Sequence, residues 1–222
     1  PRQITVALAV SNHFSVESLE ELYSGMYLAC EHYGIDLVGG DTTSSKTGLC
    51  ISITVLGEAN EEDIVYRNTA GENQLICVSG DLGAAYMGLQ LLEREKVVFQ
   101  DNGEAQPDFA GYEYILERQL KPEARKDIVE LLREKNIRPT AMIDISDGLA
   151  SEVMHICKDS GVGCNIYEEK IPIDYQTFKM AEELNMNATV CALSGGEDYE
   201  LLFTAPLDKY DLLTALPGIS VI

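Results

Sequence analysis

Carboxylate side chains occur three times in glycine-containing segments that end apolar runs of this 222-residue sequence. The segments are residues 39–42 (Gly-Gly-Asp-Thr), 144–148 (Asp-Ile-Ser-Asp-Gly) and 195–198 (Gly-Gly-Glu-Asp). Glycines let backbone N–H groups approach a phosphate closely, and carboxylates are hard oxygen ligands for Mg²⁺. One or two protein carboxylates are enough, because nucleotide phosphates complete the metal's coordination shell. Together the three segments predict metal-assisted phosphoryl transfer.

Each segment also has a structural interpretation. Residues 39–42 could form an ordinary turn at the end of a strand, and residues 195–198 could form a hairpin turn. Asp147 could cap the helix that follows it, whereas Asp144, inside the end of a strand, has no such role. The coincidence of three segments favours the chemical interpretation but leaves the structural one open.

Two further features could contribute to an anion site. Arg67 is one of three basic residues before Arg94 and could reach a nucleotide phosphate, although it could equally be a solvated arginine. Residues 80–83 (Gly-Asp-Leu-Gly) begin a predicted helix, so they could bind an anion or form a structural turn.

Several common catalytic motifs are absent from the sequence. It has no Gly-x-x-x-x-Gly-Lys-Ser/Thr loop, no His-Arg-Asp or Asp-Phe-Gly kinase signature and no Gly-x-Ser-x-Gly elbow. The three histidines lie far apart in unlike contexts, so no histidine-centred triad is predicted. The sequence identifies no catalytic residue.

Alternating strands and helices must position these segments. Apolar, β-branched runs predict strands at residues 4–10, 35–38, 49–56, 75–79, 141–145, 163–167, 190–193 and 200–204. Helical spacing and end signals predict helices at 16–33, from about 84 to 95, 122–135, from 149, 175–184 and 208–216. For the first of these, Ser15 is the predicted N-cap and Gly34 the predicted end. Residues 97–111 are predicted to be a loop. The alternation is typical of an α/β or α+β layered fold. A polar break at residues 57–63 predicts a domain boundary nearby.

The charge of the chain excludes two classes of partner. Lys and Arg number 16 against 37 Asp and Glu, giving a net charge of −21. Such a charge repels nucleic-acid backbones and anionic lipid surfaces, so we expect neither nucleic-acid nor membrane binding. The six cysteines show no metal-ligand spacing, and no apolar run is long enough to span a membrane. These features predict a cytoplasmic protein.

Three strings carry a resemblance to a known family. They are LVGGDTT at 37–43, IDISDGL at 143–149 and ALSGGEDYELLFT at 192–204, and VSGDLGAAYMGLQLL at 78–92 also matches a family segment. With them the chain resembles the thiamine-monophosphate kinases, which belong to the aminoimidazole-ribonucleotide-synthetase-like superfamily. The resemblance spans essentially the whole chain, and the Ser-Gly-Gly-Glu-Asp-Tyr-Glu-Leu string is its most specific part.

The resemblance implies a two-domain fold and an ATP-dependent activity. Residues 1–57 would be the remnant of a truncated N-terminal nucleotide-binding and dimerisation domain. Residues 58–222 would be a C-terminal α/β domain, truncated at its end. The implied reaction transfers the γ-phosphoryl group of ATP to thiamine monophosphate, with Mg²⁺ as cofactor and a homodimer as the assembly. The acceptor is an ionised phosphate oxygen, so no strong general base is needed.

The resemblance also implies roles for individual residues. Nucleotide contacts are implied at Gly40, Asp41, Arg67 and Ser146, magnesium ligands at Asp41, Asp144 and Asp147, and a thiamine-phosphate contact at Glu197.

Other functions remain open at this stage. The chain could be another ATP-dependent enzyme of the superfamily, such as an aminoimidazole ribonucleotide synthetase or a selenophosphate synthetase. The latter needs a reactive cysteine or selenocysteine near its N-terminus, in a region that we expect this chain to lack. A metal-dependent phosphatase would use similar aspartates, and a non-catalytic acidic binding module would need none of this chemistry.

Overall fold

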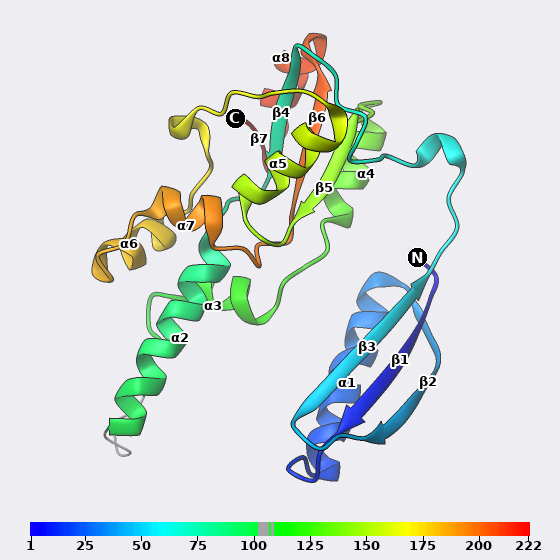
Figure 1. Cartoon of the computed structure of the whole chain (residues 1–222), viewed down its shortest axis with the longest axis vertical. Coiled ribbons are helices and arrows are strands. Elements are labelled where there is room, and N and C mark those ends of the chain that lie inside the picture. The colour runs from blue at the N-terminus through cyan, green and yellow to red at the C-terminus, as the bar shows by residue number, and fades with distance from the viewer. Residues whose placement is uncertain (102–106, 108) are drawn as a thin grey trace. The chain divides into compact units, whose positions relative to one another are not determined.

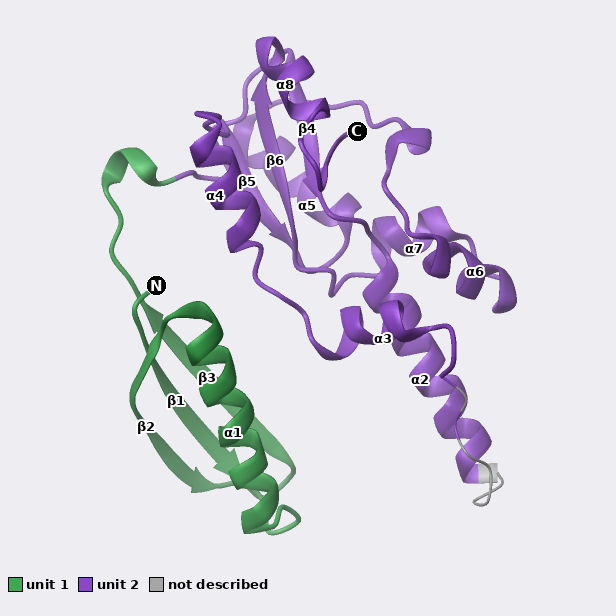
Figure 2. Ribbon diagram, turned by 180° about the vertical axis from the view of Figure 1, so that it is seen from behind, with its two compact units in different colours: residues 1–64 green, residues 65–222 purple. Residues whose placement is uncertain are grey.

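The chain divides into two compact units, residues 1–64 and 65–222 (Figure 2). This computed structural model describes residues 1–101, 107 and 109–222. The polar segment that predicts a domain boundary, residues 57–63, lies at the end of the first unit. Within the described residues, no helix is both long and apolar enough to cross a lipid bilayer.

The first unit is a three-stranded sheet with one helix (Figure 1). Its elements are β1 (Gln3–Val10), α1 (Val16–Tyr33), β2 (Asp36–Ser44) and β3 (Leu49–Leu56). The strand order is β2-β1-β3, with β2 parallel and β3 antiparallel to β1. As predicted, the Ser15 side chain caps α1 by accepting a hydrogen bond from the Ser18 N–H at 3.2 Å, and Gly34 ends the helix at a φ of 65°.

The segment at residues 39–42 is part of a strand, so the prediction of a turn there is wrong. It lies inside β2 and pairs with β1, with Gly40 opposite Val6 and Asp41 opposite Ala7. A Cβ atom at Gly40 would lie only 1.9 Å from the carbonyl oxygen of Val6. The glycine is therefore required by close strand pairing, and not by a turn.

The second unit is built on an antiparallel sheet with helices on both faces (Figure 1). Its strands, in the spatial order β5-β6-β4-β7, are β4 (Gln74–Ser79), β5 (Ala141–Ile145), β6 (Glu200–Pro206) and β7 (Ile219–Val221). On one face, α5 (Leu149–Ser160) packs through Val153 and Ile156 against Leu202. On the other face, α4 (Lys126–Glu134) and α8 (Tyr210–Thr214) cover Phe203.

Four helices form a separate cluster beside the sheet. They are α2 (Ala84–Asp101), α3 (Glu113–Leu120), α6 (Tyr175–Glu183) and α7 (Ala188–Ser194). Their shared core contains Met87, Ile115, Met180 and Cys191, all of which are buried. The cluster positions the first turn of α2 next to the sheet, where it becomes part of the candidate site.

Several predicted element boundaries are wrong. Helix α2 continues beyond Glu95 because no glycine or proline interrupts residues 89–101. This overturns the predicted loop 97–111 over residues 97–101, whereas residues 102–106 and 108 of that loop lie outside the described residues. Helix α4 begins only after Arg125, whose backbone is not helical and whose side chain pairs with Glu200, and α3 was not predicted.

Two predicted strands do not form. Residues 163–167 are not paired with any strand of the sheet in the described part of the chain. Residues 190–193 belong to helix α7, which the Asn187 side chain caps by accepting a hydrogen bond from the Val190 N–H at 3.0 Å. Short apolar runs do not distinguish a buried helix from a strand, and here the helix buries Ala188, Cys191 and Ala192 on one face.

The two neighbouring glycines of β2 provide a test of this strand pairing. In Gly40→Ala the new methyl group must displace the β1 backbone, so we expect the first unit to lose about 1–3 kcal/mol of stability. Hydrogen exchange of the β1 amides should become faster in this variant. Gly39→Ala is the matched control, because its Cβ would meet nothing within 4 Å. Equal exchange rates in the two variants would contradict the register.

Candidate active site

Three turns of the second unit lie at one end of its sheet. Ile145, at the end of β5, pairs with Glu200, at the start of β6, and Val78, near the end of β4, pairs with Leu202. Residues 80–83, 144–148 and 195–199 therefore meet at the same end of the sheet. Two of the three segments predicted from the sequence are thus brought together.

The turns at 144–148 and 195–199 are joined by backbone hydrogen bonds. The Glu197 N–H donates to the Ser146 carbonyl at 2.8 Å, and the Tyr199 N–H donates to the Ile145 carbonyl at 2.8 Å. Gly196, at a φ of 73°, lies so close to the first turn that a Cβ would be 2.6 Å from the Ser146 carbonyl oxygen. The two turns are thus hydrogen-bonded and closely packed against each other.

Three carboxylates at this pair of turns are exposed to solvent. Asp144 and Asp147 come from the first turn, and Glu197 comes from the second. The Tyr199 hydroxyl donates a hydrogen bond to Glu197 Oε2 at 2.9 Å. That hydrogen bond raises the pKa of Tyr199, and the charges of Asp144 and Asp147 raise it further. The phenol therefore lies within the electrostatic influence of all three carboxylates.

Three other carboxylates lie beneath the turns and are almost fully buried. Glu152 is 3% exposed, Asp198 2% and Glu200 1%. Glu152 accepts a hydrogen bond from the Asp147 N–H at 3.2 Å and thereby fixes the first turn. Buried carboxylates need such partners, because an unpaired buried charge is strongly destabilising.

Asp198 connects the second turn to the beginning of α2. Its carboxylate accepts hydrogen bonds from the Gly83 N–H at 2.8 Å and the Ala85 N–H at 3.4 Å. Burial raises the pKa of Asp198 to about 6, while the two amides and Arg118 favour the ionised form. The amides at the start of α2 are thus occupied by a carboxylate of the protein itself. Residues 80–83 therefore serve as a structural turn, and not as the anion site that the sequence left open.

Glu200 is bound by a network of charged and polar groups. It forms ion pairs with Arg125 and with Arg118, the latter at 2.9 Å, and accepts a hydrogen bond from the Ser79 hydroxyl. Ser79 Oγ in turn accepts a hydrogen bond from the Leu201 N–H at 2.8 Å. A Cβ at Gly80 would lie 2.2 Å from the Glu200 carboxylate, so the 80–83 turn packs directly against this network.

The donor set at the first turn fits Mg²⁺ only in part. Among residues 1–101, 107 and 109–222, no group of three or more His, Cys, Asp or Glu side chains is arranged to hold a metal ion. Asp144 and Asp147, with the Ser146 hydroxyl between them, supply hard oxygen donors. Two carboxylates match the needs of a magnesium ion whose other ligands are nucleotide phosphates and water.

Asp41 and Gly40 belong to the first unit. In β1, Val6 and Leu8 are buried and their neighbour Ala7 is exposed, so the strand has one covered and one open face. Asp41 pairs with Ala7 and so lies on the open face, whereas Gly40 pairs with Val6 on the covered face. Asp41 itself is exposed.

The structure does not bring Arg67 to the paired turns. Its Nε atom lies 2.8 Å from Asp159 Oδ2, near the C-terminal end of α5. That helix has 12 residues, and its first residue follows the 144–148 turn. At a rise of about 1.5 Å per residue, the two ends of α5 are roughly 18 Å apart.

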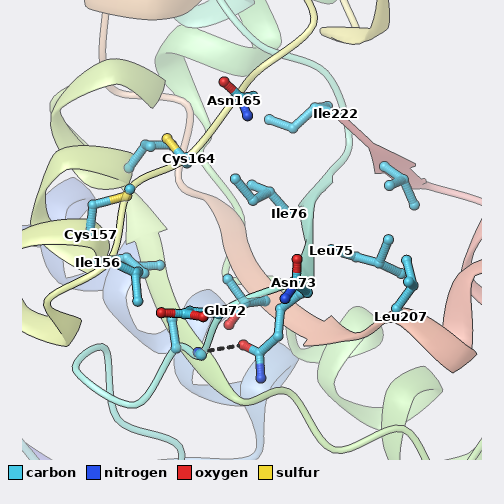
Figure 3. A pocket seen from close by; sticks show the side chains of 18 of the residues that line it. Glu72, Asn73, Leu75, Ile76, Ile156, Cys157, Cys164, Asn165, Leu207 and Ile222 are labelled. Atoms are coloured by element: carbon cyan, nitrogen blue, oxygen red, sulfur yellow. Dashed lines mark hydrogen bonds between the residues drawn. The ribbon is translucent and has the colours of Figure 1, made fainter.

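A pocket at the opposite end of the sheet was not predicted from the sequence. It has a volume of about 650 Å³ and is lined by residues of β4, α5, the segment 161–167 and the end of the chain. Figure 3 shows Cys157 and Cys164 on one side of it and Ile76 and Ile222 among its apolar lining. No spacing of residue types marked it, because its walls combine apolar and polar side chains from distant segments.

Comparison with known proteins identifies the family. The profile of the AIR synthase related protein N-terminal domain matches residues 1–59, and that of the C-terminal domain matches residues 71–213. The chain belongs to the AIR synthase related family. The predicted two-domain, layered fold is therefore confirmed.

Within this family, the chain is similar to thiamine-monophosphate kinases. That of Aquifex aeolicus is 33% identical over 211 residues, which are 95% of this chain and 64% of the relative. That of Bacillus subtilis is 32% identical over 213 residues, or 96% of this chain and 62% of the relative. The chain thus spans less than two thirds of the length of these curated relatives.

Solved structures show the same similarity. A crystal structure of the Aquifex aeolicus thiamine monophosphate kinase matches all of this chain with a TM-score of 0.83 and 32% identity, over 70% of its own length. A structure of AaThiL complexed with AMPPCP and TMP gives a TM-score of 0.80 at 31% identity, again over all of this chain and over 66% of that one.

The buried network around Glu200 can be tested by removing its charge. In Glu200→Gln, Arg118 and Arg125 lose their shared carboxylate, so we expect the second unit to lose about 2–3 kcal/mol of stability in urea unfolding. The control is Glu117→Gln, which removes an exposed ion pair with Lys121 at 3.7 Å and should leave the midpoint nearly unchanged. Similar midpoints for the two variants would show that the network does not stabilise the fold.

Proposed function

We propose that this chain forms part of a kinase that transfers the γ-phosphoryl group of ATP to thiamine monophosphate. The main support is the hydrogen-bonded pair of turns at 144–148 and 195–199, which presents three exposed carboxylates at one end of the sheet. Similarity to thiamine-monophosphate kinases over 95% of the chain supports the same activity. A similar protein has been solved in complex with AMPPCP and TMP.

The proposed metal ligands are Asp41, Asp144 and Asp147. Asp144 and Asp147 are exposed and adjacent to a serine hydroxyl, so they offer oxygen atoms without the cost of burying a charge. Bound Mg²⁺ would supply positive charge to neutralise the phosphates during transfer. Asp41 is exposed on the open face of the first unit and can contribute a further carboxylate.

The proposed nucleotide contacts are Gly40, Asp41, Ser146 and Arg67. The backbone of Ser146 is fixed because its carbonyl accepts a hydrogen bond from the Glu197 N–H. Its hydroxyl is therefore the group that would contact the nucleotide. Arg67 would have to leave Asp159 to meet a phosphate. The Arg67 side chain is half exposed in that ion pair, and exposed pairs contribute little to stability, so breaking the pair costs little. Contact with a nucleotide held at Ser146 would also have to bridge the roughly 18 Å between the two ends of α5.

The proposed acceptor contact is Glu197. Its side chain is exposed and is oriented by the Tyr199 hydroxyl. Because the acceptor is an ionised phosphate oxygen, the reaction requires positioning and charge neutralisation more than proton abstraction. The proposal therefore assigns no general base.

We also propose a homodimer and a cytoplasmic location. The strand β3 exposes Ile51, Ile53 and Val55 on one face, and apolar residues in that density commonly mark an interface. All six cysteines are free, which agrees with a reducing compartment.

Product analysis tests the activity directly. The purified protein is incubated with ATP, thiamine monophosphate and Mg²⁺, and the products are separated by chromatography. We expect thiamine diphosphate and ADP in equal amounts. Release of inorganic phosphate without thiamine diphosphate would indicate a phosphatase, and no magnesium-dependent nucleotide binding would indicate a non-catalytic module.

Two substitutions test the assignment of the two turns. Asp144→Asn removes a metal ligand, so we expect about tenfold weaker MgATP binding by calorimetry with the fold preserved. Glu197→Gln should raise the Michaelis constant for thiamine monophosphate more than that for ATP.

Each variant is the control for the other. Unchanged MgATP affinity in Asp144→Asn would remove this residue from the metal site. Equal effects of Glu197→Gln on the two substrates would remove Glu197 from the acceptor site.

A further inference from the structure

The second turn of the site has an unusual backbone. Glu197 and Tyr199 adopt left-handed conformations, with φ values of 63° and 52°. Side chains other than glycine rarely adopt this region, and such residues persist only when the surrounding structure enforces the conformation. The residue between them, Asp198, is almost fully buried. Of the two strained residues, Glu197 is exposed and Tyr199 is half-buried, and the residue that separates them is the anchored one.

Asp198 is anchored through both its side chain and its backbone carbonyl. Its side chain accepts hydrogen bonds from the Gly83 and Ala85 amides, and its carbonyl accepts one from Arg118 Nη2 at 3.1 Å. These partners belong to the 80–83 turn, α2 and α3, and not to the paired turns. The 195–199 turn is thus held by segments that contribute no exposed carboxylate to the site.

Arg118 serves three acceptors at once. It donates to the carbonyls of Asp81 at 3.3 Å and Asp198 at 3.1 Å, and it forms an ion pair with Glu200 at 2.9 Å. A planar guanidinium can meet such acceptors together, whereas a lysine ammonium on a flexible stem does not reproduce the arrangement. Arg118 therefore connects the turns at 80–83 and 195–199 to the start of β6.

We propose that Asp198 and Arg118 are positioning residues that hold Glu197 and Tyr199 in their left-handed conformations and so orient them toward the acceptor substrate. This inference rests on the proposed kinase function. Neither residue needs to touch a substrate, because each acts through the backbone of the second turn. Loss of either should affect the acceptor substrate more than the nucleotide, whose proposed ligands lie on other segments.

Asp174 offers a matched control for Asp198. Its carboxylate also caps a helix, accepting a hydrogen bond from the Gln176 N–H at 2.7 Å at the start of α6. Asp174 makes no hydrogen bond to the paired turns. Asp198→Asn and Asp174→Asn therefore each remove the charge of a helix cap, but only the first change affects the second turn.

Steady-state kinetics of these two variants test the proposal. In Asp198→Asn one carboxylate oxygen is replaced by an NH2 group, which cannot accept a hydrogen bond from the Ala85 N–H. One of the two hydrogen bonds that anchor the side chain is therefore lost. We expect the Michaelis constant for thiamine monophosphate to rise about tenfold while that for ATP changes less than about twofold. Asp174→Asn should change neither constant. An equal rise for both substrates in Asp198→Asn, or no rise at all, would overturn the proposal.

Hydrogen exchange gives a readout that does not depend on activity. The Glu197 and Tyr199 amides donate to the Ser146 and Ile145 carbonyls, so they should be protected in the unmodified protein. In Asp198→Asn and in Arg118→Lys these two amides should exchange at least about tenfold faster, with no comparable change in Asp174→Asn. Unchanged protection in both variants would refute the positioning role.

The two experiments separate the failure of this inference from that of the proposed function. If the unmodified protein makes no thiamine diphosphate, the proposed function fails and hydrogen exchange still decides whether the turn is held in this way. If Asp198→Asn does not fold, Arg118→Lys tests the same anchor through the carbonyl of Asp198. Normal kinetics and normal protection in Arg118→Lys would then count against the proposal.

Discussion

The candidate site depends on the joining of two turns that are about fifty residues apart in the sequence. The Glu197 and Tyr199 amides donate to carbonyls of the 144–148 turn, and this pair of hydrogen bonds continues the pairing of β5 with β6 beyond the end of the sheet. Glycines at 148 and 196 are needed for the close approach, because both have positive φ values and neither has room for a Cβ. Without this junction, Asp144, Asp147 and Glu197 would be unrelated surface residues.

The carboxylates around the junction divide into exposed and buried groups with different roles. Asp144, Asp147 and Glu197 remain in contact with solvent and present their carboxylate oxygens there. Glu152, Asp198 and Glu200 are buried, and each has a backbone amide or an arginine as partner. Compensated buried charges fix the geometry, and the exposed carboxylates supply the oxygen donors that the proposed magnesium site requires. The net charge of −21 therefore includes buried carboxylates that stabilise the fold and exposed carboxylates that are proposed to bind the metal.

Local patterns in the sequence predicted those elements that are stabilised locally. Helix α1 was predicted from its cap at Ser15 to its end at Gly34. The 195–198 segment meets 144–148 because it precedes β6, which pairs with β5, and not because it follows the strand predicted at 190–193. Predictions failed where distant contacts decide the outcome. Residues 190–193 are helical because α7 buries one face in the helical cluster, and residues 39–42 form a strand because Gly40 pairs closely with Val6. The pairing of Arg67 with Asp159 and the anchoring of Asp198 had no signal in the sequence, since both depend on tertiary contacts between distant segments.

Paramagnetic broadening by Mn²⁺ is the most direct test of the claim that the joined turns bind a metal–nucleotide complex. Mn²⁺ replaces Mg²⁺ at oxygen-rich sites, and it broadens the NMR signals of nearby amides. In the presence of a non-hydrolysable ATP analogue, the account predicts selective broadening of the amides of both the 144–148 and the 195–199 turns. Broadening confined to the opposite end of the sheet, around Cys164 and Asn165, or none that depends on the nucleotide, would contradict it.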